Sequence, residues 1–169
     1  MFSLNTTATL HNVTNLPAGT KAEDVIRLLH NHDALIKVDP EHAYYESLAA
    51  DPAVPNAKRY KITDHMHALP KGLWDSTVTF EAEMTDMEDG ILWVIKAPLG
   101  LTQTSTWRCL RTDSLAAEDR KGDGEWSLVE EVEISANRLL VSTVKSKGEE
   151  NWPKTHAKFL QYLAGEVQA

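Results

Sequence analysis

The hydrophobic pattern of the chain alternates between strand-like and helical segments. Residues 2–14 are rich in Thr, Val and Leu and are typical of a strand. A helical apolar stripe follows over residues 25–29, and a second short helix is expected to reach Val38, before Pro40 stops it. From about residue 42 the period is two for most of the next ninety residues. This order predicts one strand, two short helices and then an antiparallel meander.

Capping residues indicate where the two short helices begin. Thr20 and Glu23 form a Thr-x-x-Glu capping box, in which each side chain can satisfy an orphan backbone N–H. Asp33 is expected to cap the second helix.

Turns at residues 52–56, 70–72, 86–90 and 98–100 divide the meander into strands. Successive side chains of a strand point to opposite faces, so that alternate residues form one apolar face and one polar face. In the strand over residues 76–86, for example, Phe80 and Met84 oppose Glu81 and Glu83. The sheet is therefore expected to enclose an apolar interior on one side and to meet solvent on the other.

The last part of the chain returns to helical spacing. One apolar stripe spans more than six turns and consists of Leu140, Val144, Trp152, Phe159 and Leu163. Gly148 and Pro153 interrupt it, because glycine weakens a helix interior and proline removes a backbone hydrogen bond. One long helix kinked near residues 148–153 is favoured. The alternative is a strand extension to about Val144, followed by a shorter helix from about Asn151.

Length and composition predict one globular domain over residues 1–169. The chain has 42% hydrophobic and 25% charged residues, which is ordinary for a folded domain. Its net charge of −8 is unfavourable for binding nucleic acid or an anionic membrane surface. The first residues carry no secretion signal and no apolar run reaches membrane-spanning length, so we expect a cytoplasmic protein without membrane insertion. Both a monomer and a homodimer are compatible with the sequence.

Cofactor and metal chemistry has little support in the sequence. The single cysteine, Cys109, cannot build a cysteine-rich zinc site. The chain lacks a glycine-rich phosphate loop and a nucleophile elbow. We therefore expect no cofactor and no metal.

Three segments carry a resemblance to known proteins: residues 60–70 (YKITDHMHALP), 93–101 (WVIKAPLGL) and 137–140 (NRLL). They are similar to an uncharacterised domain family of filamentous fungi, over nearly the whole chain. The order of elements resembles the START-like superfamily, which includes the birch-pollen-allergen fold and polyketide cyclases. This resemblance implies an α+β helix-grip fold, with a curved antiparallel sheet of about seven strands wrapped around the C-terminal helix. It also implies a cavity for an apolar molecule between sheet and helix, but no catalytic motif.

The inward faces of the predicted strands and of the last helix identify candidate residues for this cavity. Gln103 and Ser105 share the face of Trp107 and could orient a carbonyl or hydroxyl group of a ligand. The complete set of candidate ligand-binding residues is Tyr60, Ile62, Met66, Phe80, Met84, Gln103, Ser105, Trp107, Leu128, Val132, Trp152 and Phe159.

Two carboxyl groups interrupt these apolar faces. Glu130 lies between Leu128 and Val132, and Asp64 has the parity of Ile62. A buried carboxyl group tends to have a raised pKa, which suits acid or base work. His156, one helical turn after Trp152, is a third candidate for proton transfer. The alternative is structural, since a β-bulge would shift the parity and inward carboxylates often satisfy neighbouring donors.

These features support two hypotheses. In the first, the protein is a cofactor-independent enzyme that cyclises, isomerises or dehydrates a polyketide-, terpenoid- or lipid-like substrate through Glu130, Asp64 or His156. In the second, it is a non-catalytic carrier or sensor of an apolar metabolite. An acidic interaction module is a third class, because Glu81, Glu83, Glu131 and Glu133 lie on the outer face. Such carboxylates usually serve solubility alone.

Overall fold

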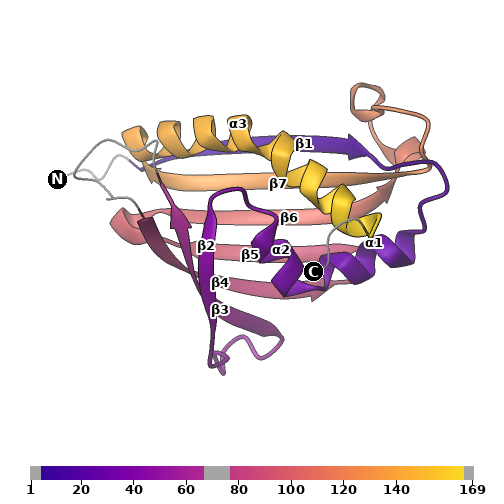
Figure 1. The fold of residues 1–169 in the computed structure, drawn as a ribbon. Coiled ribbons are helices and arrows are strands. Elements are labelled where there is room, and N and C mark those ends of the chain that lie inside the picture. Colours follow the sequence, from indigo (N-terminus) through magenta and orange to yellow (C-terminus); the bar gives the residue numbers. More distant parts are fainter. Residues whose placement is uncertain (1–4, 67–76, 166–169) are drawn as a thin grey trace.

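The structure is a computed structural model that describes residues 5–66 and 77–165 (Figure 1). Its elements are β1 (Asn5–Asn15), α1 (Ala22–Leu29), α2 (His32–Lys37), β2 (His42–Leu48), β3 (Ala57–His65), β4 (Thr77–Met87), β5 (Gly90–Lys96), β6 (Thr102–Arg111), β7 (Trp126–Asn137) and α3 (Arg138–Leu163). Short 3₁₀ helices span Pro98–Gly100, Thr112–Ser114 and Ala117–Asp119. The predicted turn at residues 70–72 lies outside the described residues.

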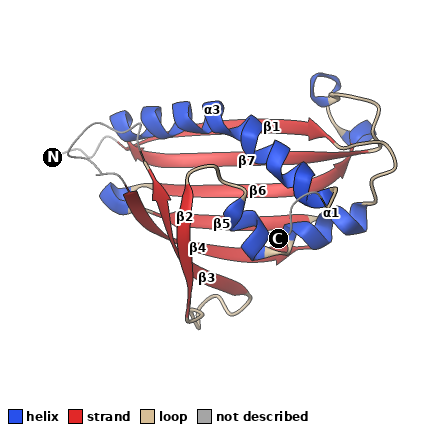
Figure 2. Cartoon of the chain, viewed as in Figure 1, coloured by secondary structure: helices blue, strands red, loops and turns tan. Residues whose placement is uncertain are grey.

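Within the described residues, seven antiparallel strands form one curved sheet in the order β1-β7-β6-β5-β4-β3-β2. The chain therefore forms a meander from β2 to β7, and β1 joins it beside β7. Figures 1 and 2 show α3 beginning over β1 and β7 and bending toward α1 in its second half. The α+β helix-grip architecture expected from the sequence is confirmed.

The long C-terminal helix is continuous through Gly148 and Pro153. It begins directly after β7, where the Asn137 side chain accepts a hydrogen bond from the backbone N–H of Leu140. Its 26 residues span about 39 Å at 1.5 Å per residue, which matches the roughly 40 Å length of the 12-residue strand β7. One helix can therefore cover the whole length of the sheet.

Both predicted helix caps are wrong. The N-cap of α1 is Lys21, without a side-chain cap, because the backbone N–H of Thr20 closes the preceding turn on Pro17. The N-cap of α2 is Asn31, whose side chain accepts from the N–H of Ala34. Asp33 lies in the first turn instead, where it pairs with Lys37 and accepts a hydrogen bond from the Tyr45 hydroxyl.

The apolar interior is divided into two clusters. The larger one lies between α1, α2, the end of α3 and the sheet, and it contains Phe159, Leu128 and Met84. The smaller one lies near the start of α3 and contains Val132, Ile134 and Leu140. The space between the two clusters is where the cavity described below is found.

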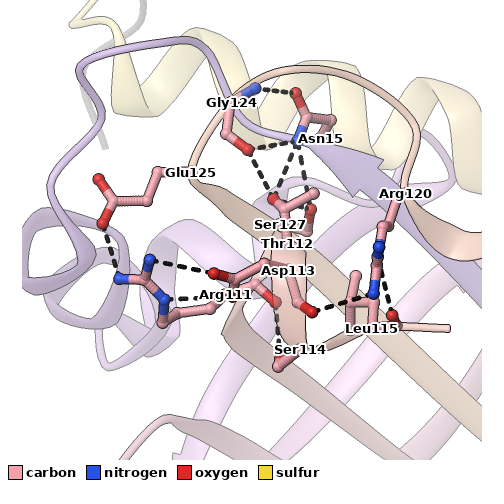
Figure 3. A network of polar contacts seen from close by, with 10 residues as sticks. All are labelled: Asn15, Arg111, Thr112, Asp113, Ser114, Leu115, Arg120, Gly124, Glu125 and Ser127. Carbon is pink, nitrogen blue, oxygen red and sulfur yellow. Dashed lines mark hydrogen bonds and ion pairs between the residues drawn. The ribbon is translucent and has the colours of Figure 1, made fainter. Parts of the chain in front are cut away.

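A polar network closes the end of the sheet next to the 112–125 loop (Figure 3). The Asn15 side chain donates to the Gly124 carbonyl at 3.0 Å and accepts from the Gly124 N–H at 2.9 Å. It also donates to the hydroxyl groups of Thr112 and Ser127, at 3.1 and 3.3 Å. Gly124 has no space for a side chain, since a Cβ atom would lie 1.8 Å from the Leu16 carbonyl oxygen. Asn15 therefore fixes the loop to β1.

Replacing Asn15 with alanine is expected to lower the free energy of unfolding by about 1–3 kcal/mol, because it leaves buried polar groups without partners. Urea unfolding followed by tryptophan fluorescence measures this loss. The exposed Asn56 provides the control, and Asn56→Ala should change the stability by less than about 0.5 kcal/mol. Equal effects of the two substitutions would mean that the network does not stabilise the loop.

Candidate functional site

A cavity of about 240 Å³ lies between the concave face of the sheet and α3. Its sheet wall comes from β1 and from β3 to β7, its roof comes from α3, and α2 with the residues after it closes one side. The lining is mostly apolar and includes Leu10, Leu35, Ile36, Val38, Ile62, Met66, Val78, Phe80, Trp93, Ile95, Ala97, Leu101, Trp107, Val132, Ile134, Val144, Gly148 and Trp152. Its polar members are Asn12, Asp39, Glu41, Asp64, Gln103, Ser105, Glu130, Lys147, Asn151 and Thr155.

Glu130 is a carboxyl group of the lining that is held by side-chain hydrogen bonds. One of its oxygens, Oε1, lies 3.0 Å from Asn12 Nδ2, which donates to it, and 3.1 Å from His156 Nε2. The other ring nitrogen of His156, Nδ1, lies 2.7 Å from the Thr14 hydroxyl. With neutral imidazole, Nε2–H donates to Glu130 and Nδ1 accepts from Thr14. A hydroxyl–imidazole–carboxylate chain thus ends at the cavity surface.

His156 is fixed in place by aromatic packing. It is 1% exposed and its ring lies 5.1 Å, between ring centroids, from both Trp107 and Trp152. Trp107 also packs against Phe159 at 5.9 Å. The imidazole cannot turn away from Glu130 without displacing one of these side chains, so that the hydrogen-bonded arrangement is preorganised.

Further carboxyl groups of the lining come from β3 and from the segment after α2. Asp64, on β3, is 7% exposed, and its Oδ1 makes no hydrogen bond. His42 Nδ1 lies 3.5 Å from this oxygen, also without a hydrogen bond. Asp39 and Glu41, from the segment after α2, line the same part of the cavity. Glu41 is paired with Lys147 of α3 at 3.5 Å.

The electrostatics of these carboxyl groups favour a retained proton. Burial raises the pKa of Asp64 to about 8, and the neighbouring Asp39 and Glu41 carboxyl groups act in the same direction. Burial is also the main cause of the raised pKa of Asp39. Burial lowers the pKa of His42, which therefore does not serve as a cation for Asp64 at neutral pH.

Other polar groups of the lining are only partly satisfied. Gln103 donates a long hydrogen bond, of 3.3 Å, to the Ser105 hydroxyl. The indole N–H of Trp93 is buried and makes no hydrogen bond. Both features leave donors available to a molecule in the cavity.

The structure separates the residues expected from the sequence into two groups. Those that line the cavity are Asp64, Glu130, Ile62, Met66, Phe80, Gln103, Ser105, Trp107, Val132 and Trp152. Tyr60, Met84, Leu128 and Phe159 lie instead in the larger apolar cluster. His156 lies behind Glu130 and reaches the cavity only through that carboxyl group.

Several polar residues of the site were not predicted from the sequence. Asn12 and Thr14 have a detectable signal, since both share one face of β1 with Leu10, which lines the cavity. Asp39 and Glu41 follow a helix in an irregular segment, where no periodicity indicates direction. Lys147 is one of five Lys and Arg residues of α3, and its inward position depends on the path of the helix.

Two absences concern residues 5–66 and 77–165 alone. In these ranges, no group of three or more His, Cys, Asp or Glu side chains could hold a metal ion. No helix of the same ranges is long and apolar enough to cross a membrane.

Solved structures with a similar fold cover almost the whole chain. One is the Zhui aromatase/cyclase from Streptomyces sp. R1128, with a TM-score of 0.65, 11% identity and coverage of 97% of this chain and 98% of that one. Another is a protein from Thermus thermophilus, with a TM-score of 0.61, 17% identity and coverage of 95% and 100%. A third is truncated norcoclaurine synthase from Thalictrum flavum, with a TM-score of 0.60, 11% identity and coverage of 96% of both chains. The fold is thus START-like and polyketide cyclase-like.

Within this fold class the family can be stated. Residues 5–165 match the family described as "Domain of unknown function (DUF7053)", so the chain belongs to it. No curated protein matches the chain.

Proposed function

We propose that the cavity binds a small, largely apolar molecule and that Glu130 transfers a proton to or from it. The observation that carries this proposal is that two carboxyl groups with different surroundings, Glu130 and Asp64, line one largely apolar cavity from different strands. Glu130 lies on β7 and Asp64 on β3, four strand positions apart in a curved sheet. A ligand between them has one proton-transfer group on one side and a polar anchor on the other.

The surroundings of Glu130 suit a base that is held in one orientation and that both removes and returns a proton. Asn12 and His156 both engage Oε1, so Oε2 is left to face the ligand. By donating a hydrogen bond to Oε1, the His156 ring can stabilise the negative charge of Glu130 before the carboxyl group gains a proton and after it loses one. Proton removal and return at adjacent atoms is the common element of non-redox isomerisation, dehydration and cyclisation. We therefore assign the protein to this reaction class, with Asp64 binding the polar end of the substrate.

The size of the cavity limits the substrate. Small-molecule sites usually have about 300–1,000 Å³, so a cavity of about 240 Å³ accommodates a compact molecule of roughly two fused rings. Aromatic side chains from three strands and α3 give the walls: Phe80, Trp93, Trp107 and Trp152. A polyketide-, terpenoid- or lipid-like body fits this lining better than a sugar or a nucleotide.

A bicyclic ketone tests the proton transfer without knowledge of the natural substrate. In D₂O the protein should accelerate exchange of the hydrogens next to the carbonyl of 1-tetralone, measured by mass spectrometry. Glu130→Gln should reduce this acceleration by about 100-fold or more, because glutamine cannot accept the proton.

Glu131→Gln is the matched control. Glu131 is the neighbouring residue of the same strand, its side chain is 65% exposed, and it points away from the cavity. Exchange should be unchanged in this variant. If 1-tetralone binds but the wild-type protein does not accelerate exchange, the second function, a carrier or sensor of an apolar metabolite, replaces the first. The same apolar cavity favours that alternative.

A further inference from the structure

The charged groups of the cavity are strongly unbalanced. Its described lining contains four carboxyl groups, those of Asp39, Glu41, Asp64 and Glu130, and one ammonium group, that of Lys147. Lys147 is already paired with Glu41. Glu130 has its own donors, Asn12 and His156. Among the carboxyl groups of the described lining, Asp39 and Asp64 have neither an ion pair with Lys147 nor a side-chain donor from outside this pair.

Asp64 provides an independent sign that a ligand group belongs at this position. It is 7% exposed and lines the cavity, yet its Oδ1 accepts no hydrogen bond. Buried carboxylate oxygens are normally satisfied, and an unsatisfied one costs free energy. A donor brought by a ligand would satisfy it.

The groups that face Asp64 supply no donor to Oδ1, because the side-chain hydrogen bond of Asp64 with Asp39 joins two carboxyl groups and raises the pKa of Asp64. On β2, His42 lies 3.5 Å away without a hydrogen bond, and its pKa is lowered by burial. Asp39 and Glu41, after α2, are acidic, as is Glu130 on β7, and Lys147 on α3 pairs with Glu41. On β4, the residue opposite Asp64 is Val78. Carboxyl groups therefore outnumber basic groups at this end of the cavity.

We propose that the ligand of the cavity is an amine, whose protonated nitrogen binds Asp64 and Asp39 while its apolar body lies between the aromatic walls. The proposal rests on the proposed function, namely that the cavity binds a small apolar molecule, and it adds the chemical class. An ammonium group has several N–H donors for the two carboxyl groups. An organic cation fits this lining, since a bare metal ion would leave the apolar walls without a partner.

The amine should also couple binding to proton release. Burial and the neighbouring carboxyl groups keep a proton on Asp64 at neutral pH, with a pKa of about 8. An ammonium group favours the ionised carboxyl groups, so binding lowers this pKa and expels a proton. The affinity for the amine should therefore rise with pH, by up to about tenfold between pH 6.5 and 7.5. A neutral ligand of the same shape lacks this increase.

Two nearly isosteric probes separate charge from shape. The affinities of 2-naphthylmethylamine, which is protonated at neutral pH, and of 2-naphthylmethanol, which is neutral, are measured by calorimetry at pH 6.5, 7.5 and 8.5. We expect the amine to bind roughly tenfold or more tightly than the alcohol at pH 7.5. Its observed binding enthalpy should differ between buffers of different ionisation enthalpy, because binding releases a proton to the buffer. Asp64→Asn should abolish the preference, whereas binding of the alcohol to this variant shows that it is folded and that its cavity is open. Asp123→Asn, at an exposed position, is the control and should keep the preference.

The outcomes distinguish this inference from the proposed function. If the alcohol binds as tightly as the amine, or more tightly, the amine proposal is wrong while the apolar cavity remains a binding site. If neither probe binds the wild-type protein, the proposed function itself fails, and the amine proposal with it. A preference for the amine that persists in Asp64→Asn also overturns the inference, because the charge would then be recognised elsewhere.

Discussion

Phe159→Ala is expected to lower the free energy of unfolding by about 3–5 kcal/mol. The Phe159 side chain is fully buried, and its ring packs against Trp107 on the sheet. Truncation removes its burial and leaves a void that the rigid sheet and helix can only partly fill. Urea unfolding monitored by far-ultraviolet circular dichroism provides the measurement.

Leu139→Ala on the same helix is the matched control. Leu139 is 61% exposed, so its truncation should cost less than about 0.5 kcal/mol. A loss below about 1 kcal/mol for Phe159→Ala would show that the second half of α3 does not pack on the sheet as described. The position of His156, less than one turn before Phe159, would then also be in question.

Asp64→Asn is expected to make the protein more stable at alkaline pH, which is unusual for a buried polar residue. The pKa of Asp64 is about 8 in the folded protein, against an ordinary value of 3.8. At this residue the folded state therefore binds more protons than the unfolded state between these values, and the contribution of Asp64 to stability falls as the pH rises from about 4 through about 8. Asparagine has a similar shape and does not ionise.

The expected difference between the two proteins grows with pH. Chemical unfolding at pH 5, 7 and 9 should show a gain of about 2–5 kcal/mol for Asp64→Asn at pH 9 and a much smaller change at pH 5. Asp123→Asn, at an exposed site, should follow the wild-type protein at each pH. A pH-independent difference would mean that Asp64 is ionised throughout this range and that its surroundings are not as apolar as described.

Periodicity was sufficient to predict the order of the elements and the apolar face of each strand, whereas the curved sheet around the C-terminal helix was implied by the resemblance to START-like proteins. The inward direction of Glu130 and Asp64 follows from the same parity, and both side chains line the cavity. The continuity of α3 through Pro153 could be favoured but not established from sequence. Its stripe of apolar residues must pack on the sheet, and this tertiary gain exceeds the local cost of one proline.

The alternation of residues along a strand does not determine which part of the interior each inward side chain contacts. Leu128 and Val132 share one face of β7, but only Val132 lines the cavity, since Leu128 lies under the larger apolar cluster. Parity gives the face of a strand and cannot divide that face between core and cavity. Likewise, Asp39 reaches the site from an irregular segment, and its proximity to Asp64 depends on how that segment crosses the sheet.

The central claim is that the space between the sheet and α3 is a binding cavity. Calorimetric titration of 2-naphthylmethanol into the wild-type protein and into Ser105→Leu tests it most directly. Ser105 lies on β6, is 5% exposed and lines the cavity, so that a leucine there would occupy ligand space. We predict one binding site in the wild-type protein and an affinity at least about tenfold lower in a folded Ser105→Leu variant. No binding to the wild-type protein, or equal binding to both, would contradict the account.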